Sequence, residues 1–464
     1  MSRKQHSSPL ELEQQPVSTL LIKYSLPAII AMIASSIYNM VDSIFIGNDV
    51  GALAISGLAV ASPLMNLSVA FGAMVGVGGA TVLSVKLGQH NYRDAMLCLG
   101  NEVTLNIILG ALFGGVALLF LDPILMLFGA SESTLPYARE YMQIILLGNI
   151  ITHVYFGLNG VLRAVGHPRQ SMMATFIAVV LNTIMDYVFI RHFGWGIKGA
   201  AVATVLAQTI ALCWQLFKLS RKDEFVRFRR GIYRPDLRLV REMLAVGVSP
   251  MLMNSCACLV NIFINNAMFT YGGVQGDGLG DIAVGAYGIN NRIIFMFFMV
   301  VMGVCQGMQP IAGYNYGARK PDRVWLVFKY ACMAGTMVMS VNFFLGLFLP
   351  EEMMRIFTSD PQLIDMAAHG MRINVVFFLV IGFQMVTTNF FQSIGHAKTA
   401  IFLSLTRQML YLLPLVLVLP HFFAQPLDGV WWALPGSDFL AIITALWMIY
   451  KKRSIFKVKT QEAA

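Results

Sequence analysis

An acidic residue inside an apolar run is the first feature of this chain that could do chemistry. Asp42 lies in the run YSLPAIIAMIASSIYNMVDSIFIG, and Tyr38 and Asn39 precede it by four and three residues. These spacings put the three side chains on one helix face. Because a charge at membrane depth is expensive, such a residue usually faces a protein interior or an aqueous path. The alternative is that Asp42 marks a helix end, since Gly47 follows closely.

Three further oxygen-bearing residues lie in two later apolar segments. Asn182 and Asp186 are four residues apart in LNTIMDYVFI, and Thr204 ends the small-residue run GAAVAT. Measured from the predicted outer helix ends, Asp42, Asp186 and Thr204 lie about 8–9 Å deep, and Asn182 about 13 Å. Monovalent cations take oxygen ligands, and paired carboxylates can instead hold a proton. The sequence predicts a site for Na⁺ or H⁺ here, with a purely structural hydrogen-bond network as the alternative.

The composition indicates that membrane helices must position these residues. The chain has 464 residues, of which 57% are hydrophobic and 12% charged, and its mean hydropathy is +0.67. Such values are typical of polytopic membrane proteins rather than of soluble domains. The polar start runs directly into a full-length apolar span, so we expect an uncleaved first anchor. The six cysteines fall in apolar segments without a zinc-binding pattern, and we interpret them as small buried hydrophobic residues.

Apolar runs of spanning length, about 20 residues, recur twelve times. They cover residues 18–46, 52–79, 95–120, 136–162, 170–190, 197–217, 243–270, 282–311, 325–349, 366–391, 399–420 and 429–450. We therefore predict an all-α polytopic membrane protein. Its expected parts are an amino-terminal lobe (1–217, helices 1–6), a basic linker (218–242), a carboxyl-terminal lobe (243–450, helices 7–12) and a basic tail (451–464).

The distribution of charge along the chain predicts its orientation. Lysine and arginine gather at both termini, in the even-numbered loops and in the linker, whereas the odd-numbered loops are acidic. By the positive-inside rule, both termini are cytoplasmic. The net charge of +9 is then a topology signal with anionic lipid as its partner, and it does not indicate nucleic-acid binding.

The second half of the chain repeats the first with a nearly constant shift. Gly88 of LGQHNYRDA corresponds to Gly317 of YGARKPDR at a shift of 229 residues, and Gly166-His167 corresponds to Gly395-His396 at the same shift. Because each half has six spans, the two units share one orientation and should be related by an axis along the membrane normal. Two such lobes around a central cleft favour an alternating-access transporter over a channel or an enzyme.

The carboxyl-terminal lobe differs from the amino-terminal lobe in its polar residues. Asn265 falls near the position equivalent to Asp42, and the 229-residue shift carries Asn182 onto Tyr411 and Asp186 onto Leu415. We find no acidic residue in the membrane interior of this half, so we expect it mainly to shape the substrate cavity. Its polar residues and its flexible methionines, which suit varied apolar cargo, give the predicted lining: Asn261, Asn265, Met268, Arg292, Met296, Met299, Arg407 and Tyr411.

Several motifs resemble the MATE (multidrug and toxic compound extrusion) family along the full length of the chain. They are PAIIAMIASSIYNMVDSIFIG, GATVLSVKLGQHN, LRAVGHPR, LNTIMDYVFI and GIKGAAVATVLAQ. The DinF-like and MepA-like branch is the most similar, and its amino-terminal lobe carries an aspartate, asparagine, aspartate and threonine cluster. The resemblance implies a cation site at Asp42, Asn182, Asp186 and Thr204, with Tyr38 and Asn39 nearby. The NorM branch instead has acidic residues in its carboxyl-terminal helices, and this sequence does not lead us to expect a NorM-type site there.

The resemblance also implies a function and a mechanism. Na⁺ or H⁺ would enter down its gradient while a cationic or amphipathic drug leaves, by a rocker-switch movement that changes the packing of the first helix around Pro27. We expect a monomer in a bacterial inner membrane, without catalytic residues and without a cofactor beyond the coupling ion. A lipid-linked oligosaccharide flippase of the same superfamily is the alternative, although it would need a strongly cationic cavity. An integral-membrane enzyme is less favoured, because the histidines lack acidic neighbours at useful spacing.

Overall fold

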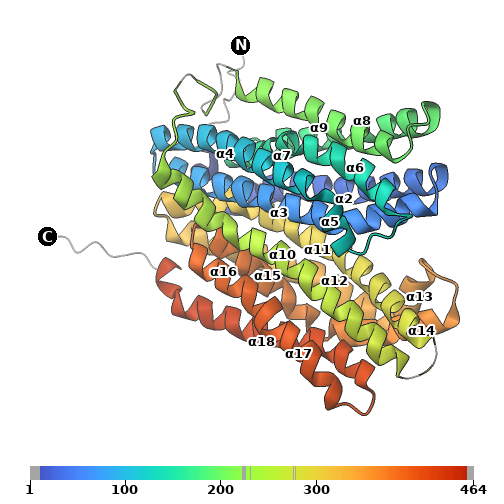
Figure 1. The fold of residues 1–464 in the computed structure, drawn as a ribbon. Helices are drawn as coiled ribbons and strands as arrows, with labels where there is room; N and C mark the ends of the chain where they lie inside the picture. The colour runs from blue at the N-terminus through green and yellow to red at the C-terminus, as the bar shows by residue number, and fades with distance from the viewer. Residues whose placement is uncertain (1–10, 222–225, 230, 275, 277, 457–464) are drawn as a thin grey trace.

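The computed structural model describes residues 11–221, 226–229, 231–274, 276 and 278–456; six side chains near the end of α2 and the start of α3 also lie outside the description (Asn39, Met40, Ser43, Ile44, Asn48 and Ala52). Within these limits the chain forms helices and connecting turns, without a strand (Figure 1). The predicted all-α fold is confirmed.

The helices of the first half are α1 (Glu11–Gln14), α2 (Val17–Asp49), α3 (Ala52–Gly88), α4 (Tyr92–Leu119), α5 (Leu121–Leu127), α6 (Leu135–Leu147), α7 (Asn149–Ala164), α8 (Pro168–Asp186), η1 (Tyr187–His192) and α9 (Ile197–Leu219). Those of the second half are α10 (Leu237–Gly273), α11 (Leu279–Gly317), α12 (Pro321–Phe348), α13 (Pro350–Arg355), α14 (Pro361–Asn374), η2 (Val375–Phe377), α15 (Phe378–Ser393), α16 (Ala397–Leu405), η3 (Thr406–Leu412), α17 (Leu413–Val418), η4 (Leu419–His421), α18 (Pro426–Lys451) and η5 (Arg453–Phe456).

The described helices provide eleven candidate membrane spans, or twelve if one bent pair is counted as a span. The eleven are long and apolar enough to cross a membrane, and the bent pair is α6 with α7, at an angle of 57°. Several helices reach beyond their predicted limits: α10 begins at Leu237, inside the stretch predicted as linker. The cysteines are free, and Cys98, Cys256 and Cys305 are buried as predicted, whereas Cys213 is exposed, so the prediction of burial is wrong for it.

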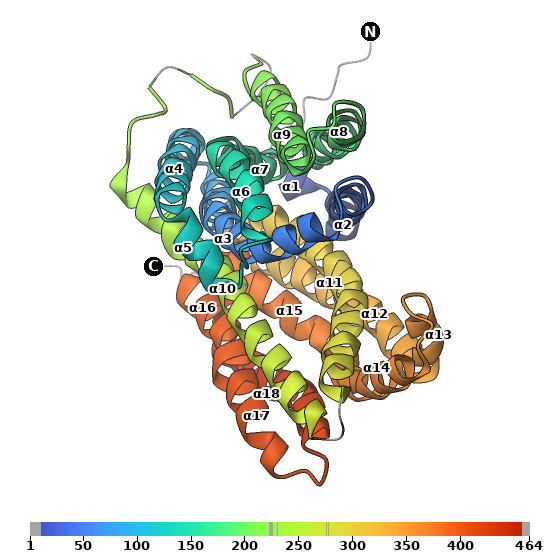
Figure 2. The same cartoon turned by 45° about the vertical axis from the view of Figure 1, so that its right-hand side comes forward.

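The two halves of the chain form two helical groups that meet along α2, α3, α10 and α11. Figure 2 shows the blue-to-green half above the yellow-to-red half. Within their interface α3 packs against α10, and α2 packs against α11. These two packings are equivalent under the sequence repeat, since α2 and α10 are the first spans of their halves and α3 and α11 the second. The duplication detected in the sequence is therefore expressed at the interface itself.

Glycines allow the two groups to approach closely at equivalent positions. A Cβ atom at Gly88 would overlap the carbonyl oxygen of Tyr314, and one at Gly317 would overlap the carbonyl oxygen of Val85. Tyr314 follows Val85 by the same 229 residues that separate the two glycines. The contact is thus symmetric, and a side chain on either glycine would separate the halves.

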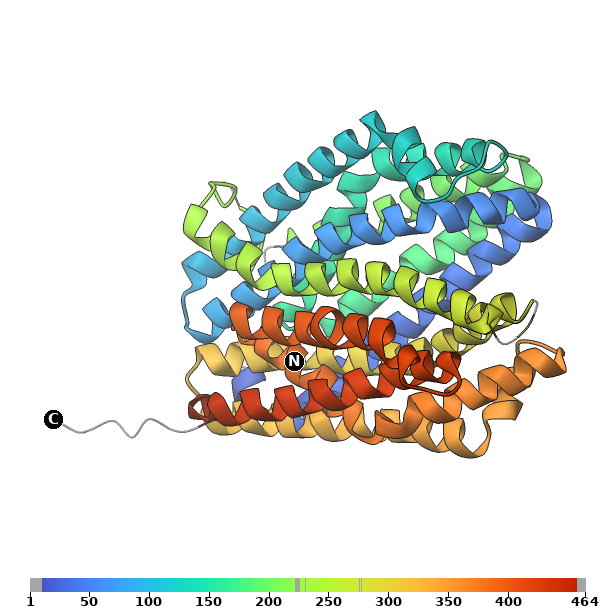
Figure 3. The same cartoon turned by 60° about the horizontal axis from the view of Figure 1, so that its bottom comes forward.

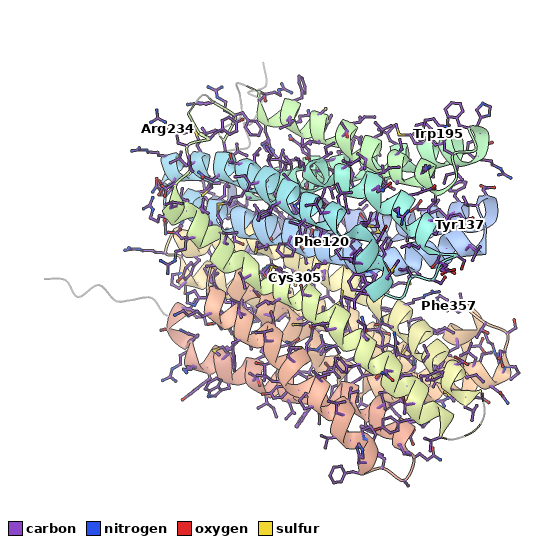
Figure 4. The ribbon with its side chains drawn as sticks, viewed as in Figure 1. Phe120, Tyr137, Trp195, Arg234, Cys305 and Phe357 are labelled. Carbon is purple, nitrogen blue, oxygen red and sulfur yellow. The ribbon has the colours of Figure 1, made fainter. Side chains whose placement is uncertain are left out.

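The two ends of the bundle differ in the residues that they carry. In Figure 3 the start of α10 and the end of α18 lie at the left, and α13 lies at the right. Figure 4 shows Arg234 at the former end, with Tyr137, Trp195 and Phe357 towards the opposite one. We call the end with Arg234 the inner end and the other the outer end. Arg234 belongs to the basic stretch that the positive-inside rule predicts to be cytoplasmic, so the inner end is the predicted cytoplasmic end.

A short segment before the first span ties the two halves together at the inner end. Buried Leu12 offers its carbonyl oxygen to Asn315 Nδ2 at 3.2 Å and to Arg323 Nη2 at 3.0 Å. Glu13 pairs with Lys320 at 2.6 Å. The hydrogen bond from Lys320 holds the pKa of the Glu13 carboxyl below its usual value. The pair therefore stays charged at neutral pH, and its stabilising effect is lost only as acid protonates Glu13.

Candidate functional site

Three helices of the first half bring the predicted acidic and polar side chains together. Asp42 comes from α2, Asn182 and Asp186 from α8, and Thr204 from α9; α8 packs against both α2 and α9. All four are buried, with exposed fractions of 5% for Asp42, 2% for Asn182, 0% for Asp186 and 8% for Thr204. Acidic and polar side chains are rarely buried without partners. We therefore interpret this cluster as a specific site of the first half.

Asn182 lies at the centre of the hydrogen bonds of this cluster. With its amide nitrogen turned towards Asp186, Asn182 donates to Asp186 Oδ2 at 2.8 Å and accepts from the Thr204 backbone N–H at 3.0 Å. This orientation satisfies both ends of the amide. The Tyr38 hydroxyl lies 3.2 Å from Thr204 Oγ1, which extends the network from α9 to α2. The four-residue spacing of Asn182 and Asp186 therefore does place them on one face.

A change of helix type occurs directly after Asp186. α8 ends at this residue and continues as a π-helix, η1, while the second half contains another π-helix, η3, which includes Arg407. π-Turns are rare and occur frequently at functional sites. Both widened turns stand beside a charged residue, Asp186 in the first half and Arg407 in the second. Sequence periodicity did not reveal them.

The two carboxylates retain capacity to bind a cation. Asp42 Oδ1 and Asp186 Oδ1 are buried without a hydrogen-bond partner among the described residues, and the two groups lie near enough for the charge of one to act on the other. Two neighbouring buried carboxylates cannot both remain ionised without a compensating charge. A shared proton, or a monovalent cation held by oxygen ligands, supplies that charge. The described part of the chain holds no cluster of three or more histidine, cysteine or acidic residues that would bind a transition metal.

One residue of this site was not identified from the sequence. Tyr141 of α6 is 1% exposed and lies close to Asp42, Asp186 and Thr204. The sequence does not predict which face of α6 points towards α2, α8 and α9, because α6 is one half of a bent span. Residue spacing therefore could not place Tyr141 in the cluster. The side chain of Asn39, which was predicted to lie near Asp42, is outside the described residues.

The second half encloses a cavity of about 380 Å³. Its wall combines apolar side chains and amides, among them Asn261, Phe298 and Met299, with an ion pair. Arg407 Nε donates to Asp438 Oδ1 at 2.8 Å, and the Arg407 guanidinium lies 5.9 Å from the centre of the Phe298 ring. Asp438 is 4% exposed, so the prediction that this half has no interior acid is wrong.

Comparison with known proteins decides the family. A family model described as MatE matches residues 27–188 and 250–418, one segment in each half of the chain. The chain belongs to the MATE family. The predicted family is confirmed, and this protein is a transporter rather than an enzyme.

Individual MATE proteins resemble the chain over nearly its whole length. The multidrug export protein MepA of Staphylococcus haemolyticus (strain JCSC1435) is 26% identical over 442 residues, which are 95% of each chain. A structure described as that of the MATE multidrug transporter DinF-BH is 34% identical and covers 98% of this chain and 99% of its own, with a TM-score of 0.88. An outward-facing MATE structure has a TM-score of 0.90 at 23% identity, with 98% and 100% coverage.

The structure places the residues predicted to line the cavity of this MATE transporter in three groups. Asn261, Met299 and Arg407 line it. Asn265, Arg292 and Met296 are exposed and lie outside the lining, while Met268 is fully buried in the core and Tyr411 hydrogen-bonds Thr444. Helical spacing alone does not separate a cavity-facing residue from one on the outside of the bundle.

Replacing Asp438 with asparagine is expected to destabilise the second half. The change leaves the half-buried Arg407 charge without its partner, which costs at most roughly 3 kcal/mol, since the cavity still admits water to the guanidinium. Thermal unfolding in detergent should show a lowered midpoint. Because the double variant Arg407→Gln/Asp438→Asn carries neither charge, it should recover most of the loss. A midpoint that falls further in the double variant would contradict this role of the pair.

Proposed function

We propose that this protein exports cationic or amphipathic drugs in exchange for H⁺ or Na⁺. The observation that carries the proposal is the buried pair Asp42 and Asp186, whose two Oδ1 atoms have no described partner. An inward-moving cation fits this arrangement, since its binding neutralises a charge that the protein otherwise leaves uncompensated. The relatives named multidrug export proteins support the choice of cargo.

Coupling in this proposal follows from the position of α2. Besides Asp42 it carries Pro27, and it packs against α8 in its own half and against α11 in the other. A proline inside a helix removes one backbone hydrogen bond and permits bending. A bound cation changes the interaction of α2 with α8, and a ligand shifts the balance of conformations only if it binds one of them better. The two halves then rock about their interface and open the cleft alternately to the two sides.

The cavity of the second half suits the proposed cargo. Its aromatic and methionine side chains offer adaptable apolar contact, and its amides offer hydrogen bonds. Asp438 supplies a negative charge that Arg407 balances in the absence of cargo. A cationic drug would therefore enter a cavity that is neutral overall, and would compete with Arg407 for the carboxylate.

The same ion pair disfavours a lipid-linked oligosaccharide flippase. A pyrophosphate head group needs several free cationic side chains in the cavity. Among the lining residues, Arg407 is the cation, and Asp438 already neutralises it. Arg292, the other arginine considered for this role, lies outside the lining.

We further propose that the protein lies in a bacterial inner membrane with both termini in the cytoplasm and that it works as a monomer. The basic linker and tail would then contact the anionic lipid of the inner leaflet. The position of Arg234, part of the basic linker, at the inner end supports this orientation (Figure 4).

Purified protein in proteoliposomes tests the exchange. We expect ethidium to move against its gradient when a proton or Na⁺ gradient is imposed separately, and only one of the two ions to drive most of the flux. Protein-free vesicles with the same gradients serve as the control. Equal ethidium movement with and without protein, under both gradients, would overturn the proposed function.

A further inference from the structure

One buried acid of the first half, unlike Asp94 with its partner Arg238, is unpaired within the described part of the chain and has no role in the site described above. Glu102 lies on α4, ten residues from its start at the inner end, which corresponds to about 15 Å along the helix. Its side chain is 0% exposed, and neither Oε1 nor Oε2 has a hydrogen-bond partner among the described residues. One turn further on, Asn106 Oδ1 is also buried without a partner. Unsatisfied buried oxygens in such a group require an explanation.

Glycines on two neighbouring helices make room for the Glu102 carboxyl group. A Cβ atom at Gly79 of α3 would lie 2.6 Å from Glu102 Oε2, and one at Gly157 of α7 would lie 3.0 Å from Glu102 Oε1. Any larger residue at either position would occupy the space of the carboxyl group. The acid is thus enclosed by α3, α4 and α7 and is not a side chain pointing into lipid.

Arg163 of α7 lies near enough for its charge to act on Glu102. The two residues do not form an ion pair in this conformation: Arg163 Nη1 instead donates to Ser171 Oγ at 3.0 Å. Ser171 in turn donates to Asn159 Oδ1 at 3.1 Å. Arg163 is therefore held on the side of α8, next to an acid that it does not contact.

The other charged groups near α4 are already paired or lie at its ends. They are Asp94 with Arg238 at 2.9 Å, Lys86 of α3 with Glu242 of α10 at 3.1 Å, and Arg139 of α6 with Asp122 of α5 at 2.5 Å. Cys98, one turn from Glu102, is buried, and a thiol in apolar surroundings stays neutral. Arg163 is the group that can compensate a negative charge on Glu102.

We propose that Glu102 is a second proton-binding site of the first half, with Arg163 as the group that takes the place of the proton. An ionised carboxylate without hydrogen-bond donors is strongly disfavoured at such a position, whereas the neutral acid is tolerated. When Glu102 releases its proton to water from the inner side, the O–H bond breaks and the carboxylate keeps the electron pair. Arg163 then exchanges its hydrogen bond to Ser171 for one to Glu102.

Polar side chains of α7 lie between this acid and the pair at the other end of the same half. Asn159 Nδ2 donates to the Tyr155 carbonyl oxygen at 3.3 Å, and Tyr155 lies in the neighbourhood of Tyr38. Tyr38 belongs to the Asp42 and Asp186 cluster through Thr204. The first half thus holds one proposed proton site towards each end, with the polar side chains of α7 between them. This inference rests on the proposed function in its proton-coupled form.

Infrared difference spectroscopy between neutral and alkaline buffer tests the proton directly. Wild-type protein in lipid should show the carbonyl band of a protonated carboxylic acid, which decreases in alkaline buffer, and Glu102→Gln should remove one component of this band. Glutamine has the shape of the neutral acid, so the variant should fold. Thr104→Val, on the same helix, is the matched control and should keep the full band. An unchanged band in Glu102→Gln would overturn the inference.

Transport distinguishes a coupling role from a purely structural one. In Glu102→Gln, drug flux driven by a proton gradient should fall by about tenfold, its dependence on inner pH should flatten, and Glu102→Asp should restore part of both. A wild-type pH profile in Glu102→Gln would overturn the coupling role even if the band is lost. If wild-type protein moves no drug, the proposed function fails, while the infrared band still decides whether Glu102 binds a proton.

Discussion

Asp186→Asn is expected to reduce ion-driven drug export by roughly 100-fold while leaving the protein folded. The asparagine side chain keeps an oxygen that can accept the hydrogen bond from Asn182, now 2.8 Å from Asp186 Oδ2. It cannot ionise, so binding and release of the cation no longer change the charge between α2 and α8. Without that change, the coupling ion binds both conformations alike and shifts neither. Asp42→Asn should have a similar effect, because its carboxyl forms the other half of the pair.

The measurement is ethidium or fluoroquinolone efflux from cells that express each variant, normalised to protein abundance in the membrane. Asp122→Asn is a suitable control, since Asp122 is a carboxylate of the same half that pairs with Arg139 at a partly exposed position. It should transport at close to the wild-type rate. Wild-type efflux in both Asp186→Asn and Asp42→Asn at equal abundance would contradict the assignment of the cation site.

The sequence could predict which residues form the cation cluster, because residue spacing and distance from the helix ends specify it. The cluster consists of Asp42, Asn182, Asp186 and Thr204. Residues four apart share a helix face, and counting from helix ends gives a common depth. The helix ends themselves were less accurate: α2 continues to Asp49 and α8 passes into a π-helix. The prediction held since helices that are neighbours in a lobe need only an approximate register to bring such side chains together.

The same reasoning did not identify two buried acids, Asp438 and Glu102. Asp438 stands in the stretch ALPGSDFLA, where proline and glycine favour a break, yet Pro435 lies inside α18 and the acid is buried against Arg407. Glu102 follows a basic and polar helix start, so its depth is underestimated from the sequence. Asp438 is paired with Arg407 of another helix, whereas Glu102 is enclosed by the glycine-containing faces of α3 and α7. No local sequence pattern encodes either arrangement.

Gly247→Ala is expected to hinder closure of the two halves at the inner end. A Cβ atom at Gly247 of α10 would overlap the carbonyl oxygen of Met74 on α3, and Gly78 of α3 is in the same relation to Met243. The obstructing atoms are backbone, so no side-chain rotation relieves the overlap and the helices must move apart. Overpacking of this kind costs about 1–3 kcal/mol. A two-state equilibrium would then shift by roughly 5- to 150-fold towards the conformation in which α3 and α10 are separated.

Spin labels near the inner ends of α3 and α11 would report this shift as a longer distance distribution, and drug export should fall in parallel. Gly273→Ala is the matched control, because Gly273 lies on the same helix and a Cβ there would meet nothing within 4 Å. An unchanged distance distribution in Gly247→Ala would mean that the close α3–α10 contact does not limit the movement of the halves. A shift in Gly247→Ala alone would instead tie the close packing of α3 against α10 to alternating access. It would do so independently of the acids, since Gly247 is on a helix that contributes nothing to the cluster of Asp42 and Asp186.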